Sequence, residues 1–271
     1  MTQISRGLRA VLVGFTALVL VVIYTPLLLV LLNSFNADKT FTWPPSELTL
    51  HWWDVAAHST GARSALWTSV EVALAATAVS LVLGTLAALA LRPTRFFGRN
   101  VISLLIILPI ALPGIVTGIA LSNMFTTVLG VGLSLFTVVV AHATFCIVTV
   151  FNNVQARVQR LGSNYEQASM DLGAGRWTTF RLVTFPMLRS ALLAGALLSF
   201  GLSFDEIVVT TFTISATDQT LPIWIFQNLF RPNQAPVVNV VAAVLVLLSA
   251  VPIYLAQRLS GSHAEGLTGA R

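Results

Sequence analysis

Two neighbouring carboxylates, Asp205 and Glu206, lie inside an apolar stretch of the sequence, where ionised side chains are costly. Hydroxyl residues recur around Glu206 at helical spacing, so that one helix face is polar. Asp205 lies about 100° away, on the face of Gly201, where we expect another helix to approach. Intramembrane acids usually face a polar cavity or a partner. The candidate pathway residues are Ser203, Asp205, Glu206 and Thr210, and Ser199 and Thr213 extend the polar face. The alternative is that both acids reach the outer lipid headgroups.

Catalytic and nucleotide-binding motifs are absent from the sequence. The only lysine, Lys39, lacks the glycines of a phosphate-binding loop of the form G-x4-G-K-[ST]. His142 stands alone in an apolar stretch, where a hydrogen bond between helices is the expected role. Cys146 is the only cysteine, so an intramolecular disulfide is impossible and a cysteine metal site is not expected. We expect no catalytic residue, no metal and no cofactor.

The elements that position these side chains are membrane-spanning helices. The chain has 271 residues, of which 56% are hydrophobic and only 9% charged, whereas a soluble domain carries about 25% charged residues. A helical span needs about 20 apolar residues. The sequence predicts an all-α polytopic membrane protein with a single transmembrane domain over residues 1–271. Its six spans are expected at 11–32, 66–91, 101–124, 131–151, 190–213 and 237–257.

The distribution of basic residues predicts the orientation of the chain. No lysine or arginine falls inside the six spans, and 12 of the 15 lie before the first span, in alternate loops or after the last span. Loops rich in lysine and arginine stay in the cytoplasm. We therefore expect both termini to be cytoplasmic. This distribution also explains the net charge of +5 without a nucleic-acid partner.

Prolines and glycines in the third predicted span indicate a bend. Pro109 and Pro113 lie four residues apart, and each removes a backbone donor from the helix. Gly114 and Gly118 form a small-residue surface of the GxxxG type. We expect a bent helix that packs closely against a neighbour.

The cytoplasmic loop at 152–189 encodes two short amphipathic helices joined by a sharp bend. Ser163 and Glu166 have the spacing of a capping box, which starts a helix. Gly173 suits the end of that helix, and Pro186 marks the beginning of the fifth span. Tyr165, Ala168, Ser169 and Leu172 form a mildly apolar face. By physical chemistry alone this face could lie on the membrane or dock to a partner.

The same loop resembles the signature of permease subunits of bacterial ATP-binding cassette (ABC) importers. The segment from Gln167 to Pro186 reads Gln-Ala-Ser-x3-Gly-x9-Val-x-Phe-Pro. It is similar to the family's Glu-Ala-Ala-x3-Gly-x9-Ile-x-Leu-Pro, and both gaps have the same length. The first position departs from the signature, because Gln167 replaces the glutamate and Glu166 lies one residue earlier.

The resemblance implies a type I importer permease fold with six spans and both termini in the cytoplasm. It implies that the loop is a coupling helix that inserts into a cleft of a separate ATPase. The implied coupling residues are Glu166, Gln167, Ala168, Ser169, Asp171, Leu172, Gly173 and Pro186. The implied partners are two ATPase subunits, a second permease that is identical or homologous, a periplasmic binding protein and the lipid bilayer of the inner membrane. ATP would be bound by the partner ATPases.

Two further runs, at 108–118 and 203–209, resemble permeases for spermidine and putrescine. Carboxylates are suitable partners for such polycationic amines. Related permeases move iron complexes or phosphonates, which stay open as alternative substrates. A different class of protein also stays open, namely a self-contained channel or secondary transporter that uses Asp205 and Glu206, or an assembly scaffold that carries no substrate.

Overall fold

The structure is a computed structural model that describes residues 5–39, 44–91, 97–162, 164–231 and 234–265. These residues form helices joined by short connections, and Asn36 and Leu48 form an isolated β-bridge. Five helices are long and apolar enough to cross a membrane, or six if one bent pair counts as a single span. The predicted all-helical, multi-pass class is therefore confirmed. The chain divides into two compact units, Met1–Arg63 with Ile225–Leu247 and Ser64–Trp224 with Leu248–Arg271.

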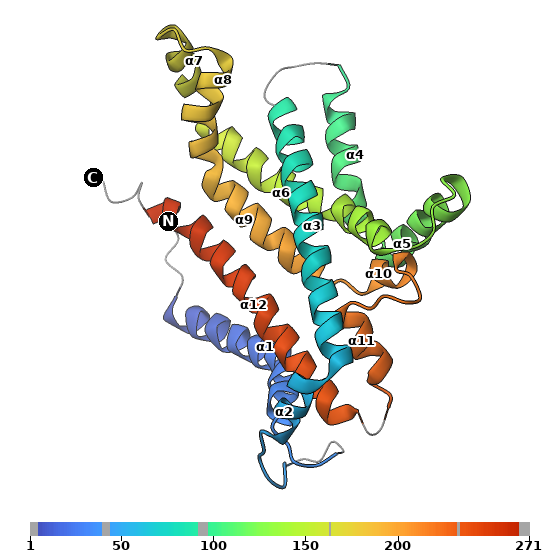
Figure 1. Ribbon diagram of the computed structural model, residues 1–271. Coiled ribbons are helices and arrows are strands. Elements are labelled where there is room, and N and C mark those ends of the chain that lie inside the picture. Colours follow the sequence, from blue (N-terminus) through green and yellow to red (C-terminus); the bar gives the residue numbers. More distant parts are fainter. Residues whose placement is uncertain (1–4, 40–43, 92–96, 163, 232–233, 266–271) are drawn as a thin grey trace. The chain divides into compact units, whose positions relative to one another are not determined.

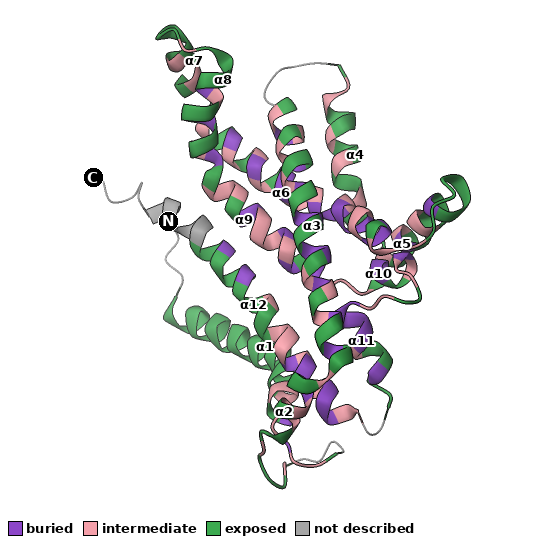
Figure 2. Ribbon diagram, in the orientation of Figure 1, coloured by how far each residue is buried: buried purple, intermediate pink, exposed green. Residues whose placement is uncertain are grey.

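The first unit contains α1 (Arg6–Asn33) and α2 (His51–His58). The apolar window of α1 has no buried residue, and Figure 2 shows most of the helix as exposed. A helix that is apolar on every side is suited to contact lipid or another chain. The connection to α2 folds on itself, since the Trp52 indole donates to the Ala37 carbonyl at 3.3 Å and Phe35 stacks on Trp53.

The second unit is built around α6 (Leu135–Leu161), which packs along α9 (Phe185–Phe204). Their shared core includes Phe151, Val154 and Leu188. Helix α3 (Thr60–Ala90) approaches α6 very closely at Gly84. A Cβ at that glycine would lie 2.9 Å from the Ile147 carbonyl oxygen and from the Val150 Cβ. Figure 1 shows these helices in the second unit, with α7 and α8 beyond the N-terminal end of α9.

The third predicted span is broken rather than bent. Helix α4 (Arg99–Ala111) and the pair α5 (Gly114–Asn123) and η1 (Met124–Val128) are bent by 105°. Leu112 is extended between them, because the residue before a proline is driven out of the helical region. The expected close packing at Gly114 and Gly118 is confirmed.

The partner at that contact is α10 (Val208–Thr213). A Cβ at Gly114 would lie 3.2 Å from Val208 Cγ1, and one at Gly118 would lie 2.7 Å from Phe212 Cδ2.

The fifth span differs from the predicted range 190–213 at both ends. A continuous helix runs over Arg176–Phe204 and comprises α8 (Arg176–Thr179), the π-helix η2 (Phe180–Thr184) and α9. It stops at Phe204, and α10 begins only at Val208. The Glu206 carboxylate accepts a hydrogen bond from the Val209 amide at 2.8 Å. Such a local side-chain bond to the backbone competes with the helical ladder and accounts for the break.

The last two helices are α11 (Leu221–Asn228) and α12 (Ala235–Glu265).

The predicted loop 152–189 is shorter than expected. Helix α6 extends to Leu161 and the fifth span starts at Arg176, so most of that range is helical.

Candidate functional site

The segment from Asn164 to Pro186, hereafter the hook, contains α7 (Asn164–Asp171), α8, η2 and the first residues of α9. Helix α7 ends in a left-handed turn at Gly173, whose φ is +86°. The Gly173 amide donates to the Met170 carbonyl at 2.9 Å, and the Ala174 amide donates to the Ser169 carbonyl at 3.1 Å. These two bonds form the Schellman motif, which satisfies the last carbonyls of a helix. The bend expected at Gly173 is therefore present. Ser163 of the expected capping box lies outside the described residues.

One side of α7, together with the turn that follows it, is exposed. Leu172, which directly follows the last residue of α7, is 90% exposed. The predicted coupling residues Gln167, Ala168, Asp171 and Gly173 are also exposed, and Pro186 lies exposed at the start of α9. The predicted coupling residues on this side of the hook are therefore accessible in the structure.

The opposite side of α7 is tied to the beginning of the fifth span. The Thr184 hydroxyl donates to the Glu166 carboxylate, and the hydroxyls of Ser169 and Thr179 share a hydrogen bond of 3.0 Å. Both threonines are buried, with 4% exposure for Thr179 and 5% for Thr184. Glu166 and Ser169 are therefore half-buried and point toward the beginning of the fifth span.

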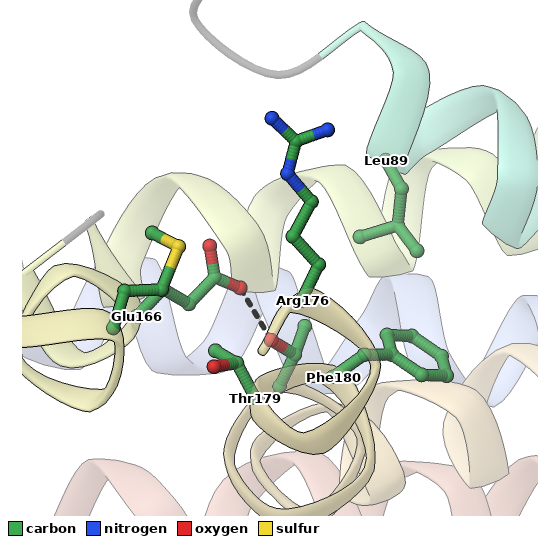
Figure 3. A pocket seen from close by; sticks show the side chains of 7 residues that line it. Leu89, Glu166, Arg176, Thr179 and Phe180 are labelled. Atoms are coloured by element: carbon green, nitrogen blue, oxygen red, sulfur yellow. Dashed lines mark hydrogen bonds between the residues drawn. The ribbon is translucent and has the colours of Figure 1, made fainter. Parts of the chain in front are cut away.

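A pocket of about 330 Å³ opens beside these bonds. Figure 3 shows the Glu166 carboxylate with its dashed hydrogen bond to a threonine hydroxyl, and Thr179, Phe180 and Arg176 around the pocket. The lining residues are Leu89, Glu166, Met170, Arg176, Thr179, Phe180 and Thr184. The pocket thus joins the C-terminal end of α3 to the hook.

A second polar cluster lies where the fifth span breaks. His142 on α6 is 1% exposed. Its Nδ1 lies 2.7 Å from Ser203 Oγ and its Nε2 lies 2.8 Å from Thr210 Oγ1. Ser203 precedes the break and Thr210 follows it. The imidazole therefore spans the break and links α9 to α10, which confirms the expected hydrogen bond between helices.

The hydrogen count fixes the tautomer of this histidine. The single hydroxyl proton of Thr210 is donated to the Glu206 carbonyl at 2.8 Å. Thr210 must then accept from His142, so Nε2 carries the ring proton. Nδ1 is the acceptor, and Ser203 donates to it. Every polar atom of the bridge is satisfied.

Further hydrogen bonds continue this cluster along α6. Ser199 donates to the Cys146 carbonyl at 3.2 Å, and the Cys146 thiol lies 3.4 Å from the Ser199 carbonyl. The Thr137 hydroxyl lies 2.7 Å from the Thr213 carbonyl oxygen and 2.7 Å from that of Ser134, so the two carbonyls share its proton. We call Thr137, His142, Cys146, Ser199, Ser203, Thr210 and Thr213 the polar seam. The hydroxyl periodicity noted in the sequence therefore belongs to a helix contact.

The four predicted pathway residues occupy different surroundings. Ser203 and Thr210 are buried in the polar seam. Asp205 is exposed, and Glu206 is half-buried with its carboxylate on the Val209 amide. Gly201 lies on the same helix face as Asp205, where we expected another helix to approach. Helix α12 does approach there, since a Cβ at Gly201 would lie 3.8 Å from Ile253 Cγ1. Among the described residues, no three His, Cys, Asp or Glu side chains gather as a metal site.

Several residues of the two clusters, among them Thr179, Thr184 and His142, were not singled out as site residues by the sequence. Thr179 and Thr184 lie five positions apart, a spacing that predicts opposite faces of an α-helix. His142 was expected to bond between helices, but nothing in the sequence pointed to a bridge across a break. The one available signal was Pro186, which perturbs the helix that carries both threonines.

Comparison with known proteins agrees with this geometry. Residues 80–263 match the family described as binding-protein-dependent transport system inner membrane component. The chain is 29% identical over 268 residues to the spermidine/putrescine transport system permease protein PotC of Escherichia coli strain K12, covering 98% of this chain and 99% of that protein. It is 30% identical over 271 residues to the putrescine transport system permease protein PotI of the same strain, covering 96% and 94%.

A solved structure shares the fold. A bacterial ABC transporter involved in the import of the acidic polysaccharide alginate matches with a TM-score of 0.71 and 16% identity, covering 95% of this chain and 99% of that one. The range 80–263 that matches the family includes both the hook and the polar seam. The chain belongs to the family of inner-membrane components of binding-protein-dependent transport systems.

Proposed function

We propose that this chain is the permease subunit of an ABC importer for polyamines and that it forms half of the translocation pathway. The observation that carries the proposal is the family match over residues 80–263 together with an exposed hook at the family's signature position. Similarity to PotC and PotI over nearly the whole chain supports putrescine or spermidine as the substrate. The subunit itself is a transport component and not an enzyme.

The proposed assembly contains two ATPase subunits, a second permease and a periplasmic binding protein. Both termini and the hook lie on the cytoplasmic side, since the basic residues gather in the loops on that side. The fold is of the type I importer class. The second permease is a second copy of this chain or a homologue, and no nucleic acid is involved.

In this assembly the hook is the coupling helix. Ala168 and Leu172 are its docking face, Asp171 makes a polar contact to the ATPase, and Gly173 is the bend. Gln167 stands at the position of the signature glutamate and faces outward, so its amide replaces a charged contact with a neutral one. Ser169, Glu166 and Pro186 hold the hook to the fifth span. Closure of the ATPases on ATP would then move the hook and switch the spans between outward-open and inward-open states.

Asp205 and Glu206 are the proposed contacts for a cationic substrate. They lie at the break in the fifth span, where backbone and carboxylates can face a cavity within a membrane. No lysine or arginine lies in the predicted spans to repel a polyamine. Ser203 and Thr210 contribute by holding the two sides of the break through His142.

Affinity isolation of the tagged chain in mild detergent tests this proposal. We expect an ABC ATPase and a second permease among the chains that copurify. In liposomes containing the isolated complex, labelled putrescine or spermidine should accumulate only with ATP and loaded binding protein. Iron complexes and phosphonates serve as competing substrates. Flux through liposomes that contain this chain alone would instead favour a self-contained transporter or channel.

A further inference from the structure

The π-helix η2 sets the register between the hook and the fifth span. We propose that η2 aligns Thr179 and Thr184 so that both form hydrogen bonds to α7, and that α7 and α9 therefore move as one body. We call these two hydrogen bonds, Thr184 to Glu166 and Thr179 to Ser169, the clamp. This inference rests on the proposed function and deepens it, because it identifies positioning residues for the coupling of ATP hydrolysis to transport.

The two threonines share a neighbour only because the helix between them is widened. In an α-helix, residues five positions apart are rotated by about 140° and cannot both face one neighbour. A π-helix closes i→i+5 hydrogen bonds, so that residues five apart lie much closer to one face. Thr179 immediately precedes η2 and Thr184 is its last residue. Both hydroxyls consequently point at the same neighbouring helix.

The facing residues on α7 have matching spacing. Glu166 and Ser169 lie three positions apart, and residues at that spacing share one face of an α-helix. Glu166 accepts from Thr184, and Ser169 pairs with Thr179 at 3.0 Å. Two bonds at separate points along α7 resist rotation as well as separation, which a single bond would not do.

Pro186 explains why the π-turn occurs at this place. Proline has no amide hydrogen and clashes with the carbonyl four residues earlier, which here is that of Leu182. In the structure the Phe185 amide donates to the Phe180 carbonyl, five residues back. The wider turn accommodates the proline and at the same time shifts Thr184 onto the face of Thr179. The proline of the signature therefore has a second role, in setting the clamp.

The clamp defines where force applied to α7 is delivered. The turn at 172–175 also joins α7 to the fifth span, and its two glycines, Gly173 and Gly175, lie in open surroundings. The fifth span continues without interruption from Arg176 to Phe204 and then breaks beside Asp205. Displacement of α7 should therefore reach the break directly, and without the clamp α7 would swing about the turn.

Valine substitutions test the clamp because they remove a hydroxyl and keep the branched shape. The double variant T179V/T184V should lower uptake in proteoliposomes on the order of tenfold, since two partly buried hydrogen bonds are lost. Basal ATP hydrolysis by the copurified ATPase should continue, so that more ATP is consumed per substrate imported. The serine variants T179S and T184S keep the hydroxyls and should couple ATP hydrolysis to uptake as the parent does. T178V, at the exposed neighbouring threonine, is the matched control and should behave as the parent.

Hydrogen exchange on the detergent-purified complex provides a readout that does not depend on transport. The amides of 164–171 should exchange faster in T179V/T184V than in the parent, while those of α9 stay protected. Equal exchange and equal coupling in the parent and the double valine variant would overturn the inference. Faster exchange without any loss of coupling would show that the clamp exists but does not position the hook for transport, and this too would overturn it.

A reversible cross-link replaces the clamp by a covalent bond. In a C146A background, S169C/T179C should be weakly coupled when reduced and regain coupling on oxidation, because the disulfide joins the same two positions. Recovery on oxidation and loss on reduction would support the inference, and identical coupling in the two redox states would contradict it. Failure of any ATPase to copurify with the parent chain would instead contradict the proposed function, so the two failures are distinguishable.

Discussion

Two interruptions of helical structure in the second unit, the turn at Gly173 and the break between α9 and α10, differ in how the chain is kept rigid. At the hook, the turn at Gly173 is exposed and its geometry comes from the backbone, through a left-handed glycine and two amide hydrogen bonds. At the break between α9 and α10, the backbone is held by a buried side chain, His142, which bonds to both flanks. Water can satisfy an exposed turn, whereas within a membrane the protein must supply every partner.

This difference predicts opposite sensitivities to mutation. The turn at Gly173 should tolerate changes of side chain that leave its backbone geometry intact, and should fail when that geometry changes. The break should tolerate little change in its polar side chains. Each side chain that is removed leaves a buried polar atom without its hydrogen-bond partner. We expect the free energy of unfolding to fall most when the buried bridge is removed and least when a single bond beside it is lost.

Replacement of His142 by leucine should have the largest effect. The variant leaves the Ser203 hydroxyl without its acceptor and the Thr210 oxygen without its donor, in positions that are almost fully buried. A buried polar group without a partner costs about 1–3 kcal/mol, so we expect a loss of about 2–4 kcal/mol. Thermal unfolding in detergent measures it. His58→Leu at an exposed site is the control, and equal stability of H142L and H58L would show that the bridge is dispensable.

Gly118→Leu should come next, by a different mechanism. A Cβ at Gly118 would lie 2.7 Å from Phe212 Cδ2, so the larger side chain must force α5 and α10 apart at a cost of about 1–3 kcal/mol. Gly14→Leu offers a matched comparison, because nothing lies within 4 Å of a Cβ at Gly14. Denaturant unfolding should give a lower free energy of unfolding for G118L than for G14L. If G118L and G14L had the same free energy of unfolding, close packing between α5 and α10 would not be required.

Gly173→Val sharpens the comparison at the hook. The φ of +86° at Gly173 is unfavourable for a β-branched residue by about 1–2 kcal/mol. We expect uptake to be lost while membrane insertion is retained, because the cost falls on the bend and not on the core. Asp171→Lys, on the exposed face, should also abolish uptake by reversing a contact to the ATPase.

Gly175→Ala is the control for the bend, because Gly175 has a φ of −66° that alanine adopts readily. Uptake and membrane insertion are measured in the same cells. Normal uptake by both G173V and D171K would remove the hook from the coupling mechanism.

Ser199→Ala should have the smallest effect of the series. It removes one hydrogen bond to the Cys146 carbonyl. That carbonyl lies inside α6, where it also takes part in the helical backbone hydrogen bonds. Hydrogen bonds between helices in membranes are worth about 0.6 kcal/mol on average. A loss as large as that of H142L would mean that the polar seam acts as a single unit and that the bridge has no special position in it.

The sequence predicts the hook better than the break, because the signals for the hook are local. The loop spacing and Gly173 predict a short helix, a bend and an exposed face, and Leu172 lies on that face as expected. The pairing of Glu166 with Thr184 could not be predicted, since it depends on a π-turn that changes which residues share a face.

The two breaks in the spans were only partly predictable. Pro109 and Pro113 both indicated a bend, but Pro109 lies inside α4 and only Pro113 ends a helix. In the fifth span the hydroxyl periodicity runs evenly from Ser199 to Thr213 and predicted one continuous helix. The break arises from a side-chain bond to the backbone at Glu206, which leaves no trace in hydrophobic patterning.

Cross-linking at Leu172 tests most directly the central claim that an ATPase drives this chain through the hook. In a C146A background, a cysteine at Leu172 should form an adduct with a cysteine in the cleft of the copurified ATPase, and its yield should change when ATP is added. A cysteine at Phe136, which is 66% exposed at the other end of α6, should form none. An importer that transports its substrate while Leu172→Cys never contacts the ATPase, at any stage of ATP turnover, would contradict the account.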